Sequence, residues 1–357
     1  MAIARTPRRL VQSHRSFCVF SLHALLNDKA KVNKIREFHL FAGIGGGIYG
    51  GKLLGHTCCA GVEIDEFCQK ILRQRQKDGW MDKFPIYGDL TKLHGEPYRD
   101  TFEILCGGFP CQAFSHAAHG KNIAEKNLWN EMYRFVQESN ASIVFGENVT
   151  LKALTKAKED LMAVGYKVEL CKLSCGELGA DHRRDRFWLL AVKDDEVFKK
   201  LADHITKLPK LSGDFWAKAP DEVGESVPVT NRRAQLKAVG NAQSPFVAAC
   251  VFRILVNRHL NHKFSAPVAN PSEINAVFDR KKTWIKEAYG EEFGLVHTPT
   301  TMANYSAPSM MKHQGCRNFK EVFGKPTPDN AEYLMGFPLG ASSEYPMNQH
   351  NIKLWTD

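Results

Sequence analysis

The amino-acid sequence predicts a doubly wound α/β fold. From residue 35 onward, short apolar or β-branched runs alternate with amphipathic stretches of helical length. This alternation is typical of a largely parallel sheet covered by helices on both faces. Ligands of such sheets bind at the carboxyl ends of the strands, so we expect the functional residues there. The strand candidates are residues 35–42, 58–63, 102–109, 142–149, 167–174 and 186–192.

Helices are predicted between these runs at residues 66–79, 128–139 and 151–165, the last ending at Gly165 as a helix C-terminus should. A further helix is expected after the turn sequence VGNAQSP, because Ser244 and Pro245 suit a cap and a first turn. Four apolar residues then fall on one helical face. They are Val247, Cys250, Val251 and Ile254.

Two later stretches have weaker patterns. Between residues 196 and 235 the helical and strand periodicity is lost among Lys, Pro and Gly residues. Residues 262–357 are too polar and too often broken by proline for a second core. We therefore expect one large domain with irregular additions.

Composition limits the classes of protein. The 357 residues are 43% hydrophobic, and most of the net charge of +9 lies in the first 36 residues, which hold eight Lys or Arg and one Asp. A polyanionic partner would thus need charge clustered in a cleft. We find no apolar run long enough to cross a bilayer, so we expect no membrane contact.

Ten cysteines without a hydrophobic signal peptide are typical of reduced thiols in an intracellular protein, and we expect a cytoplasmic location. Cys171 and Cys175 have no CxxC partner, so no metal is predicted. Residues 1–27 are Arg- and Ser-rich and free of acids, as in organelle transit peptides. A basic tail or an upstream translation start would have the same composition.

The motif FAGIGGG, residues 41–47, closes the first strand. Its glycines allow a tight turn that brings backbone N–H groups against a nucleotide-like ligand. A dinucleotide fingerprint would need glycine where Ile48 stands. Glu63 and Asp89 end the next segments, where they could accept hydrogen bonds from ribose hydroxyls and an exocyclic amine. The alternative is a glycine turn with two solvated acids.

A second motif, GGFPCQAFS at residues 107–115, raises the question of whether Cys111 is a nucleophile or an inert core residue. The cysteine follows a strand and a proline and has polar neighbours. A positive field at that position would lower its pKa and favour the thiolate.

Two further motifs lie at strand ends. Glu147 of GENV is either a surface charge or an acid placed over a bound base. Arg184 and Arg186 of HRRDRFWLL are two residues apart and would share one face of an extended segment, so both could point into one cleft. A solvated charge run is the alternative.

Taken in order, these motifs resemble the cytosine-C5 methyltransferase family. The matching stretches span roughly residues 37–257. They read FAGIGG, VEID, GDL, GGFPCQAFS, LW, ENV, HRRDR and VGNAQSP. The resemblance implies a Rossmann-like α/β sheet that depends on S-adenosyl-L-methionine, with a small irregular target-recognition region. It also implies double-stranded DNA as substrate, and we expect a monomer.

The resemblance assigns roles residue by residue. Cys111 becomes the nucleophile, Glu147 the acid that holds and protonates the ring nitrogen, and Arg184 and Arg186 the guanidinium groups near the base. The remaining matched residues would form the cofactor site. They are Phe41, Ala42, Gly43, Gly45, Glu63, Ile64, Asp89, Leu90, Pro110 and Asn241.

The implied chemistry agrees with the residue types. Cytosine C5 is a poor nucleophile until a thiolate adds to C6, and an acid at N3 relieves the charge that develops. A base inside a duplex must also be flipped out. Residues 112–127 are then the candidate for a closing loop.

The resemblance also suggests five segments. They are a basic extension (1–34), a catalytic domain (35–195), a target-recognition segment (196–235), a returning helix (236–261) and a C-terminal extension that could read DNA (262–357).

The chain departs from the family pattern at three positions. His39 stands where Asp is usual, Ala113 where Pro is usual, and His182 where Gln is usual. None of them removes a catalytic group. Three alternatives stay open: a methyltransferase acting on transfer RNA, a non-catalytic nucleic-acid-binding scaffold, and a nicotinamide-dependent oxidoreductase, which the incomplete glycine fingerprint disfavours.

Overall fold

The computed structural model describes most of the chain from residue 34 onward. Residues Ile35–Asp357 form one compact unit. The described residues are 34–110, 128–212, 216, 224–262, 267–279, 295–296, 298–299, 316–317 and 322–356. Cys111, Ala113 and the predicted closing loop 112–127 therefore lie outside the described residues.

A seven-stranded sheet in the order β3-β2-β1-β4-β5-β7-β6 forms the centre of this unit. All neighbours are parallel except β7, which runs antiparallel to both β5 and β6. The six predicted strands are confirmed, and the structure adds β3, which is too short to show a sequence pattern. The strands are β1 (Arg36–Leu40), β2 (Thr57–Val62), β3 (Ile86–Tyr87), β4 (Ile104–Gly108), β5 (Ile143–Asn148), β6 (Lys167–Ser174) and β7 (Asp185–Val192).

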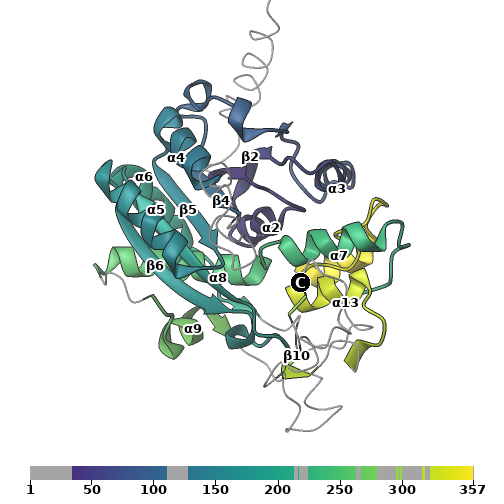
Figure 1. Cartoon of the computed structure of the whole chain (residues 1–357). Coiled ribbons are helices and arrows are strands. Elements are labelled where there is room, and N and C mark those ends of the chain that lie inside the picture. The colour runs from purple at the N-terminus through teal and green to yellow at the C-terminus, as the bar shows by residue number, and fades with distance from the viewer. Residues whose placement is uncertain are drawn as a thin grey trace, which may run out of the picture. The chain divides into compact units, whose positions relative to one another are not determined.

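Helices cover both faces of the sheet, as predicted for a Rossmann-like fold (Figure 1). One face carries α2 (Gly46–Leu53) and α8 (Pro245–Leu260), and the other carries α4 (Leu128–Ser139) and α5 (Leu151–Ala163). The four predicted helices are confirmed as α3 (Glu66–Lys77), α4, α5 and α8, whereas α2 was not predicted. Gly165 follows α5 with φ of +94°, which only glycine adopts without strain.

Helix α8 returns to the sheet from late in the chain and packs against α2. Nearly every side chain from Pro245 to Val256 is buried, so the helix is apolar all round rather than on one face. At the close approach, a methyl group added to Gly46 would overlap the carbonyl oxygen of Gln243. The start of α2 can therefore meet the turn before α8 only because residue 46 is glycine.

Two further helices that were not predicted lie between β7 and α8. α6 (Asp195–Lys207) lies at the end of the predicted catalytic domain and inside the segment assigned to target recognition, and packs against α8. Its apolar residues do recur at helical spacing, so the signal was present in the sequence. They are Phe198, Leu201, Ala202 and Ile205. α7 (Arg232–Asn241) is mostly polar and gave no such signal.

The C-terminal region contributes to the main core. Tyr333, Leu334 and Phe337 are fully buried, in or just after α13 (Pro328–Met335). The prediction that no second core forms here therefore needs refinement, because these residues join the first core. The shorter elements are η1 (Leu90–Lys92), η2 (Glu96–Tyr98), η4 (Gly176–Leu178), β8 (Leu211–Ser212), α9 (Pro271–Val277), β9 (Phe278–Asp279), β10 (Leu295–Val296), β11 (Cys316–Arg317) and α14 (Gln349–Thr356).

The sequence analysis expected no apolar run long enough to cross a bilayer, and one stretch departs from that expectation. Residues Arg232–Leu260 are long and apolar enough to span a membrane by length and composition alone, but 89% of the most apolar window is buried inside the protein. A buried core helix passes the same test.

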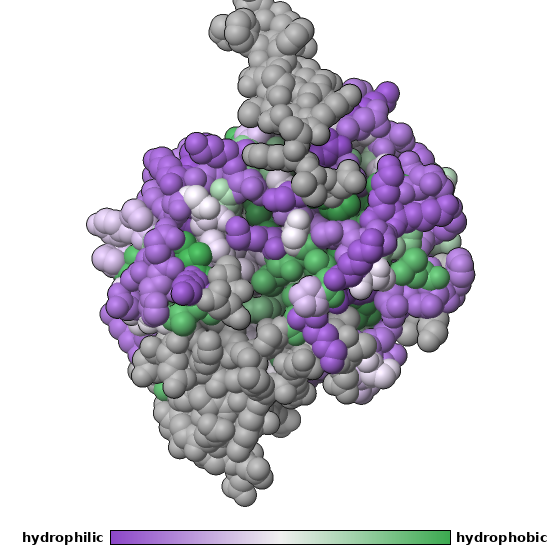
Figure 2. Space-filling model, turned by 180° about the vertical axis from the view of Figure 1, so that it is seen from behind, coloured by the Kyte–Doolittle hydropathy of each residue, from purple (hydrophilic) through white to green (hydrophobic). Residues whose placement is uncertain are grey.

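The face seen in Figure 2 is mostly hydrophilic, and hydrophobic residues gather near its middle. Seven of the cysteines are free and buried, namely Cys58, Cys59, Cys68, Cys106, Cys171, Cys175 and Cys250.

Candidate active site

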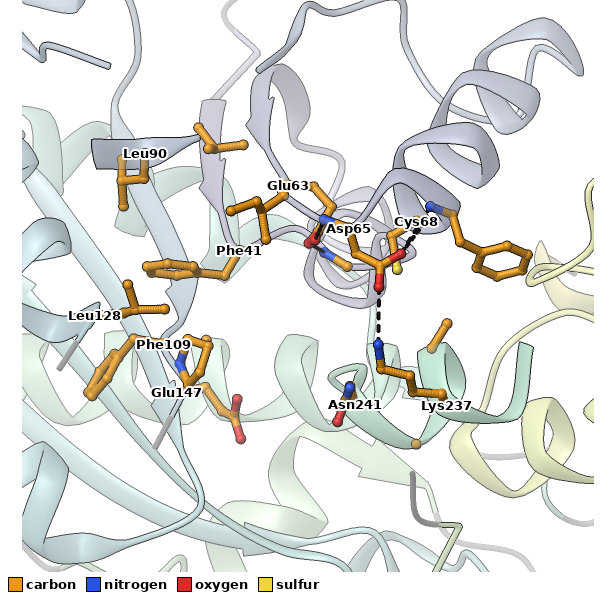
Figure 3. A pocket seen from close by; sticks show the side chains of 18 of the residues that line it. Phe41, Glu63, Asp65, Cys68, Leu90, Phe109, Leu128, Glu147, Lys237 and Asn241 are labelled. Carbon is orange, nitrogen blue, oxygen red and sulfur yellow. Dashed lines mark hydrogen bonds and ion pairs between the residues drawn. The ribbon is translucent and has the colours of Figure 1, made fainter. Parts of the chain in front are cut away.

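A cavity of about 740 Å³ opens at the carboxyl ends of the central strands, where ligands of doubly wound sheets bind (Figure 3). Most of the residues predicted from the sequence line it. They are Phe41, Gly43, Glu63, Ile64, Asp89, Leu90, Pro110, Glu147, Arg186 and Asn241. Cys111 follows Pro110 in the sequence but lies outside the described residues.

Three predicted residues do not line the cavity. Ala42 donates its backbone N–H to the carbonyl of Val62 at 2.9 Å, and Gly45 is the N-cap of α2 with φ of +92°. Both act behind the cavity wall, where they shape the turn after β1. The third, Arg184, is described below.

The turn after β1 is fastened to the end of β2 by Glu63. Gly43 donates its backbone N–H to Glu63 Oε2 at 2.6 Å, and Asp65 donates to Glu63 Oε1 at 2.7 Å. Burial raises the pKa of Glu63, while the two backbone donors oppose that shift. Each carboxylate oxygen keeps a second lone pair for a ligand hydroxyl.

Asp89 starts the short helix η1. Its Oδ1 accepts from the backbone N–H of Thr91 at 3.0 Å and from the Thr91 hydroxyl at 2.7 Å. These hydrogen bonds lower the pKa of Asp89, so the group is ionised at neutral pH. Glu63 and Asp89 thus give this part of the cavity two carboxylates.

Glu147 and Arg186 meet at the opposite part of the cavity. Arg186 Nε lies 3.0 Å from Glu147 Oε1, and both side chains are mostly buried. Glu147 is near the end of β5 and Arg186 near the start of β7, so the antiparallel pairing of these strands brings the two together. Figure 3 shows Glu147 on one side of the cavity and Lys237 and Asn241 on α7 across from it.

Arg184 is not placed as the sequence analysis expected. Its guanidinium donates to the carbonyls of Ala242 at 2.7 Å, Gly240 at 3.1 Å and Pro299 at 3.4 Å, and it does not line the cavity. The expectation assumed an extended chain, but Arg184 has φ of +40° and precedes β7. Burial lowers the pKa of the Arg184 guanidinium, yet an arginine stays charged at neutral pH.

Two residues that the sequence analysis did not assign also shape the site. Asn148 donates from Nδ2 to the carbonyl of Phe109 at 2.9 Å and so fixes the chain just before Pro110. Lys237 reaches from α7 to Asp65 Oδ2 at 3.2 Å, across the cavity (Figure 3). The motif ENV pointed to Asn148, whereas no sequence signal pointed to Lys237.

The charges of the cavity distinguish between ligands. Among the described residues that line it, the cations are Lys237 and Arg186, and each is paired with an acid. A diphosphate would need unpaired cations or a glycine fingerprint. The two carboxylates instead suit the hydroxyls and amine of a nucleoside that carries a positive charge.

Comparisons with known proteins agree with this geometry. The sequence profile described as "C-5 cytosine-specific DNA methylase" matches residues 35–338. The chain belongs to the C-5 cytosine-specific DNA methylase family. The sheet described above is the S-adenosylmethionine-dependent methyltransferase variant of the Rossmann-like fold.

Individual relatives in this methylase family match part of the chain. Type II methyltransferase M.MspI of Moraxella sp is 30% identical over 175 residues, which are 44% of this chain and 38% of that protein. M.HhaI of Haemophilus parahaemolyticus is 27% identical over 179 residues, 48% of this chain and 52% of that protein. The matches thus span about half the length of these relatives or less.

A solved structure of a Spodoptera frugiperda DNMT2 mutant aligns with a TM-score of 0.38 and 16% sequence identity. The alignment covers 45% of this chain and 50% of that protein.

Proposed function

We propose that this protein is a DNA (cytosine-5)-methyltransferase that uses S-adenosyl-L-methionine as methyl donor. The observation that carries the proposal is the Glu147–Arg186 pair, 3.0 Å apart, in the same cavity as Glu63, Asp89 and Pro110. The acid can protonate a ring nitrogen of a pyrimidine, and the guanidinium beside it can donate hydrogen bonds to the neighbouring ring oxygen. Pro110 connects this wall directly to Cys111 in the sequence.

The protein's own residues would act in sequence on the base. The Cys111 thiolate adds to C6 of the cytosine, and the electron pair of the C5–C6 bond becomes available at C5. Glu147 donates a proton to N3, and Arg186 offers its N–H groups near O2. After methylation, a water molecule takes up the C5 proton, the electron pair of the C5–H bond restores the C5–C6 double bond and expels the thiolate, and Glu147 takes back the N3 proton.

The cofactor would occupy the part of the cavity near the glycine turn. Glu63 and Asp89 would accept from the sugar hydroxyls and the adenine amine, while Phe41, Ile64 and Leu90 offer apolar surface. Ile64 is 73% exposed, which is unusual for a large apolar side chain and suits contact with a ligand. When bound, S-adenosyl-L-methionine supplies an electrophilic methyl group.

Double-stranded DNA is the proposed partner, with the target base flipped into the cavity. A base within a duplex cannot be reached from both faces, whereas a flipped base can. Glu147 and Arg186 lie with their side chains 12% and 21% exposed, as expected for groups that meet a base rather than bulk solvent. Transfer RNA with the same cytosine chemistry is the alternative substrate.

Trapping on DNA that contains 5-fluorocytosine tests the proposal. Fluorine cannot leave as a proton does, so a working thiolate remains attached to the base and gives a stable protein–DNA adduct. We expect the adduct with wild-type protein and cofactor, and none with Cys111→Ala. Labelled cofactor with DNA and with transfer RNA, side by side, separates the two substrates. An adduct with Cys111→Ala would contradict the assignment of the nucleophile.

A further inference from the structure

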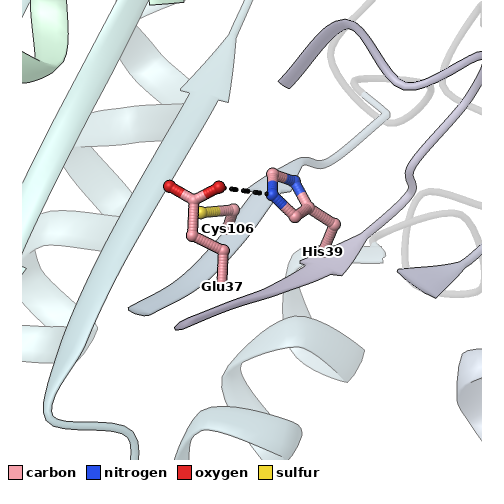
Figure 4. A group of neighbouring side chains, drawn as sticks. All are labelled: Glu37, His39 and Cys106. Carbon is pink, nitrogen blue, oxygen red and sulfur yellow. Dashed lines mark hydrogen bonds and ion pairs between the residues drawn. The ribbon is translucent and has the colours of Figure 1, made fainter. Parts of the chain in front are cut away.

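Two groups of buried polar side chains take no part in the proposed mechanism. The first is Glu37 of β1 with its neighbours (Figure 4). Glu37 Oε2 lies 2.8 Å from His39 Nε2, and Glu37 Oε1 lies 2.6 Å from His56 Nδ1. Glu37, His39 and Cys106 also bring potential metal-ligand atoms within 4.8 Å of one another. Both carboxylate oxygens already contact imidazole nitrogens, however, so this group needs no ion to satisfy its hydrogen bonds.

The second group surrounds the guanidinium of Arg184, at the end of helix α7. Nη2 of Arg184 donates to the carbonyls of Ala242 at 2.7 Å and Gly240 at 3.1 Å, and Nη1 donates to the carbonyl of Pro299 at 3.4 Å. Arg184 is 6% exposed, and among the described residues its guanidinium forms no ion pair. This buried cation therefore acts on the backbone rather than on an acid.

The carbonyls at the end of α7 need donors that the helix itself cannot supply. The last turn of an α-helix leaves its C=O groups without intrahelical N–H partners, and this end of a helix attracts positive charge. The last turn of α7 contains no basic residue. Arg184 supplies that charge from another part of the chain. Because its Nη2 contacts the carbonyls of both Gly240 and Ala242, it fixes the backbone on either side of Asn241.

Asn241 is the residue whose placement depends on this contact. It lines the cavity, across from Glu147 (Figure 3). The Asn241 side chain is exposed and makes no hydrogen bond among the described residues, so its amide keeps donors and an acceptor for a ligand. No side-chain contact orients Asn241, and its direction is therefore set by the backbone that Arg184 holds.

One short stretch of chain contacts both sides of the cavity. Arg186 pairs with Glu147 at 3.0 Å, and two residues earlier Arg184 holds the turn around Asn241. The hydroxyl of Thr298 accepts from the backbone N–H of Arg184 at 3.1 Å and so stabilises the positive φ of +40° at this residue. The two arginines thus fix the placement of the acid and of Asn241 relative to each other.

We propose that Arg184 is a positioning residue for Asn241 and thereby sets how tightly the cofactor binds, whereas Arg186 acts at the base. The inference rests on the proposed function. It departs from the resemblance, which placed both guanidinium groups near the base. A side chain that is already oriented loses less conformational freedom when a ligand binds. Loss of Arg184 therefore weakens binding of S-adenosyl-L-methionine more than it slows the chemical step.

Affinity and rate measurements on two variants test the assignment. Arg184→Lys keeps the charge but lacks the planar fork, and Arg184→Met removes the charge. We expect the dissociation constant of S-adenosyl-L-methionine to rise about 5-fold and about 10-fold respectively, while kcat at saturating cofactor changes less than about 3-fold. Calorimetry measures the affinity and labelled cofactor the rate. A lower kcat with unchanged affinity would place Arg184 at the base and overturn the proposal.

Arg253→Met is the matched control for lost stability. Arg253 is also buried and also donates to backbone carbonyls, those of Leu208 and Pro209, but it does not line the cavity. We expect this variant to be less stable than the wild type and to bind the cofactor equally well. An equal loss of affinity in Arg253→Met and Arg184→Met would reveal a general effect of destabilisation and contradict the proposal. Should Arg184→Met fail to fold, Arg184→Lys carries the comparison.

A double-variant cycle tests whether Arg184 acts through Asn241. Asn241→Ala removes the side chain that the turn orients. We expect Arg184→Lys to weaken cofactor binding about 5-fold in the wild-type background and less than about 2-fold in the Asn241→Ala background. Equal effects in the two backgrounds would show that Arg184 acts on the cofactor by another route, and the link to Asn241 would be wrong.

Hydrogen exchange of the backbone gives a readout that needs neither cofactor nor methyl transfer. The amide of Ala242 donates to the carbonyl of Val239 at 3.1 Å. We expect this amide to exchange about 10-fold faster in Arg184→Lys and at the wild-type rate in Arg253→Met. Unchanged exchange in Arg184→Lys would overturn the proposal. If the exchange and affinity results hold but the wild-type protein methylates no DNA, the proposed function fails and the role of Arg184 in the cofactor site stands.

Discussion

Arg186 Nε lies 3.0 Å from Glu147 Oε1, across the antiparallel pair of β5 and β7. Strand pairing rather than sequence proximity brings the two together, since Glu147 lies near the end of β5 and Arg186 near the start of the adjacent strand β7. The contact engages Oε1 of Glu147, which lines the cavity, and Oε2 is not part of the pair. A ligand can therefore meet the acid without breaking its contact with the arginine.

Replacement of the acid should remove activity with little effect on the fold. We expect Glu147→Gln to reduce methyl transfer by about 100-fold or more, because positioned acids typically contribute at least that factor. Rates under saturating DNA and cofactor measure the effect, and binding of S-adenosyl-L-methionine should stay within two-fold. Near-normal rates in this variant would argue against an acid role for Glu147.

Arg184 and Arg186 of the HRRDR motif should behave differently. Arg184→Met leaves three backbone carbonyls without their buried donor, so we expect a loss of about 3 kcal/mol in the free energy of unfolding. Arg186→Met should retain most of the stability and lose activity instead. Urea unfolding of both variants provides the comparison. Equal stability losses would contradict the distinct placements.

Cofactor binding should depend on Glu63. We expect Glu63→Gln to weaken S-adenosyl-L-methionine binding by roughly 10-fold, because an amide is a poorer acceptor and repels one of the two backbone N–H groups it faces. Isothermal titration calorimetry measures the affinity directly. Asp160→Asn is a suitable control, since Asp160 lies on α5 away from the cavity. An unchanged affinity would exclude Glu63 from the cofactor site.

The sequence predicted those parts of the fold that local pattern determines. The β-branched run at 142–149 predicted β5 because a strand buried on both faces needs apolar residues throughout. The sequence analysis did not predict α7. This helix packs against α13, so its position depends on residues far along the chain. In the candidate active site, too, the residues placed by local pattern were predicted correctly and those placed by the tertiary fold were not. Glu147 was found from its strand end, whereas Arg184 was misplaced because a positive φ turns its side chain away from the cavity.

His182 shows how a departure from a family pattern can be explained only by tertiary contacts. Its Nε2 meets the carbonyl of Leu334 on α13 at 2.6 Å, and burial lowers its pKa to about 3, so it is a neutral donor at physiological pH. The sequence alone could not identify this partner, which lies 152 residues away.

Acid should destabilise the protein through Glu37. Its pKa in the folded protein is about 2, below the ordinary value of 4.5, so its stabilising contribution is present above pH 4.5 and is lost as the pH falls toward 2. We expect a loss of roughly 3 kcal/mol over that window, from a shift of about 2 pKa units or more. Urea midpoints across this range should fall more steeply for the wild type than for Glu37→Gln. Parallel curves would show that Glu37 is not the responsible group.

Arg75 of α3 should stabilise the packing of the C-terminal region against this helix. Its fully buried guanidinium pairs with Asp78 at 3.0 Å and donates to the carbonyls of Gly340, Ser343 and Tyr345. We expect Arg75→Met to cost about 3 kcal/mol of stability, since it leaves the buried acid Asp78 without its cationic partner and three carbonyls without the guanidinium donor. Limited proteolysis should then cleave first between residues 336 and 348. Exposed Arg73 on the same helix provides the control, and cleavage elsewhere would contradict this role.

The late position of α8 has a consequence for synthesis. Ribosomes release the strands of the sheet in order, but the apolar surface of α2 has no cover until the chain has been extended through α8. A nascent chain paused before that point would expose this apolar surface to solvent, and its folding would have to wait for translation to pass the turn at Gln243. Truncated messages should accordingly yield aggregates rather than half-sized domains.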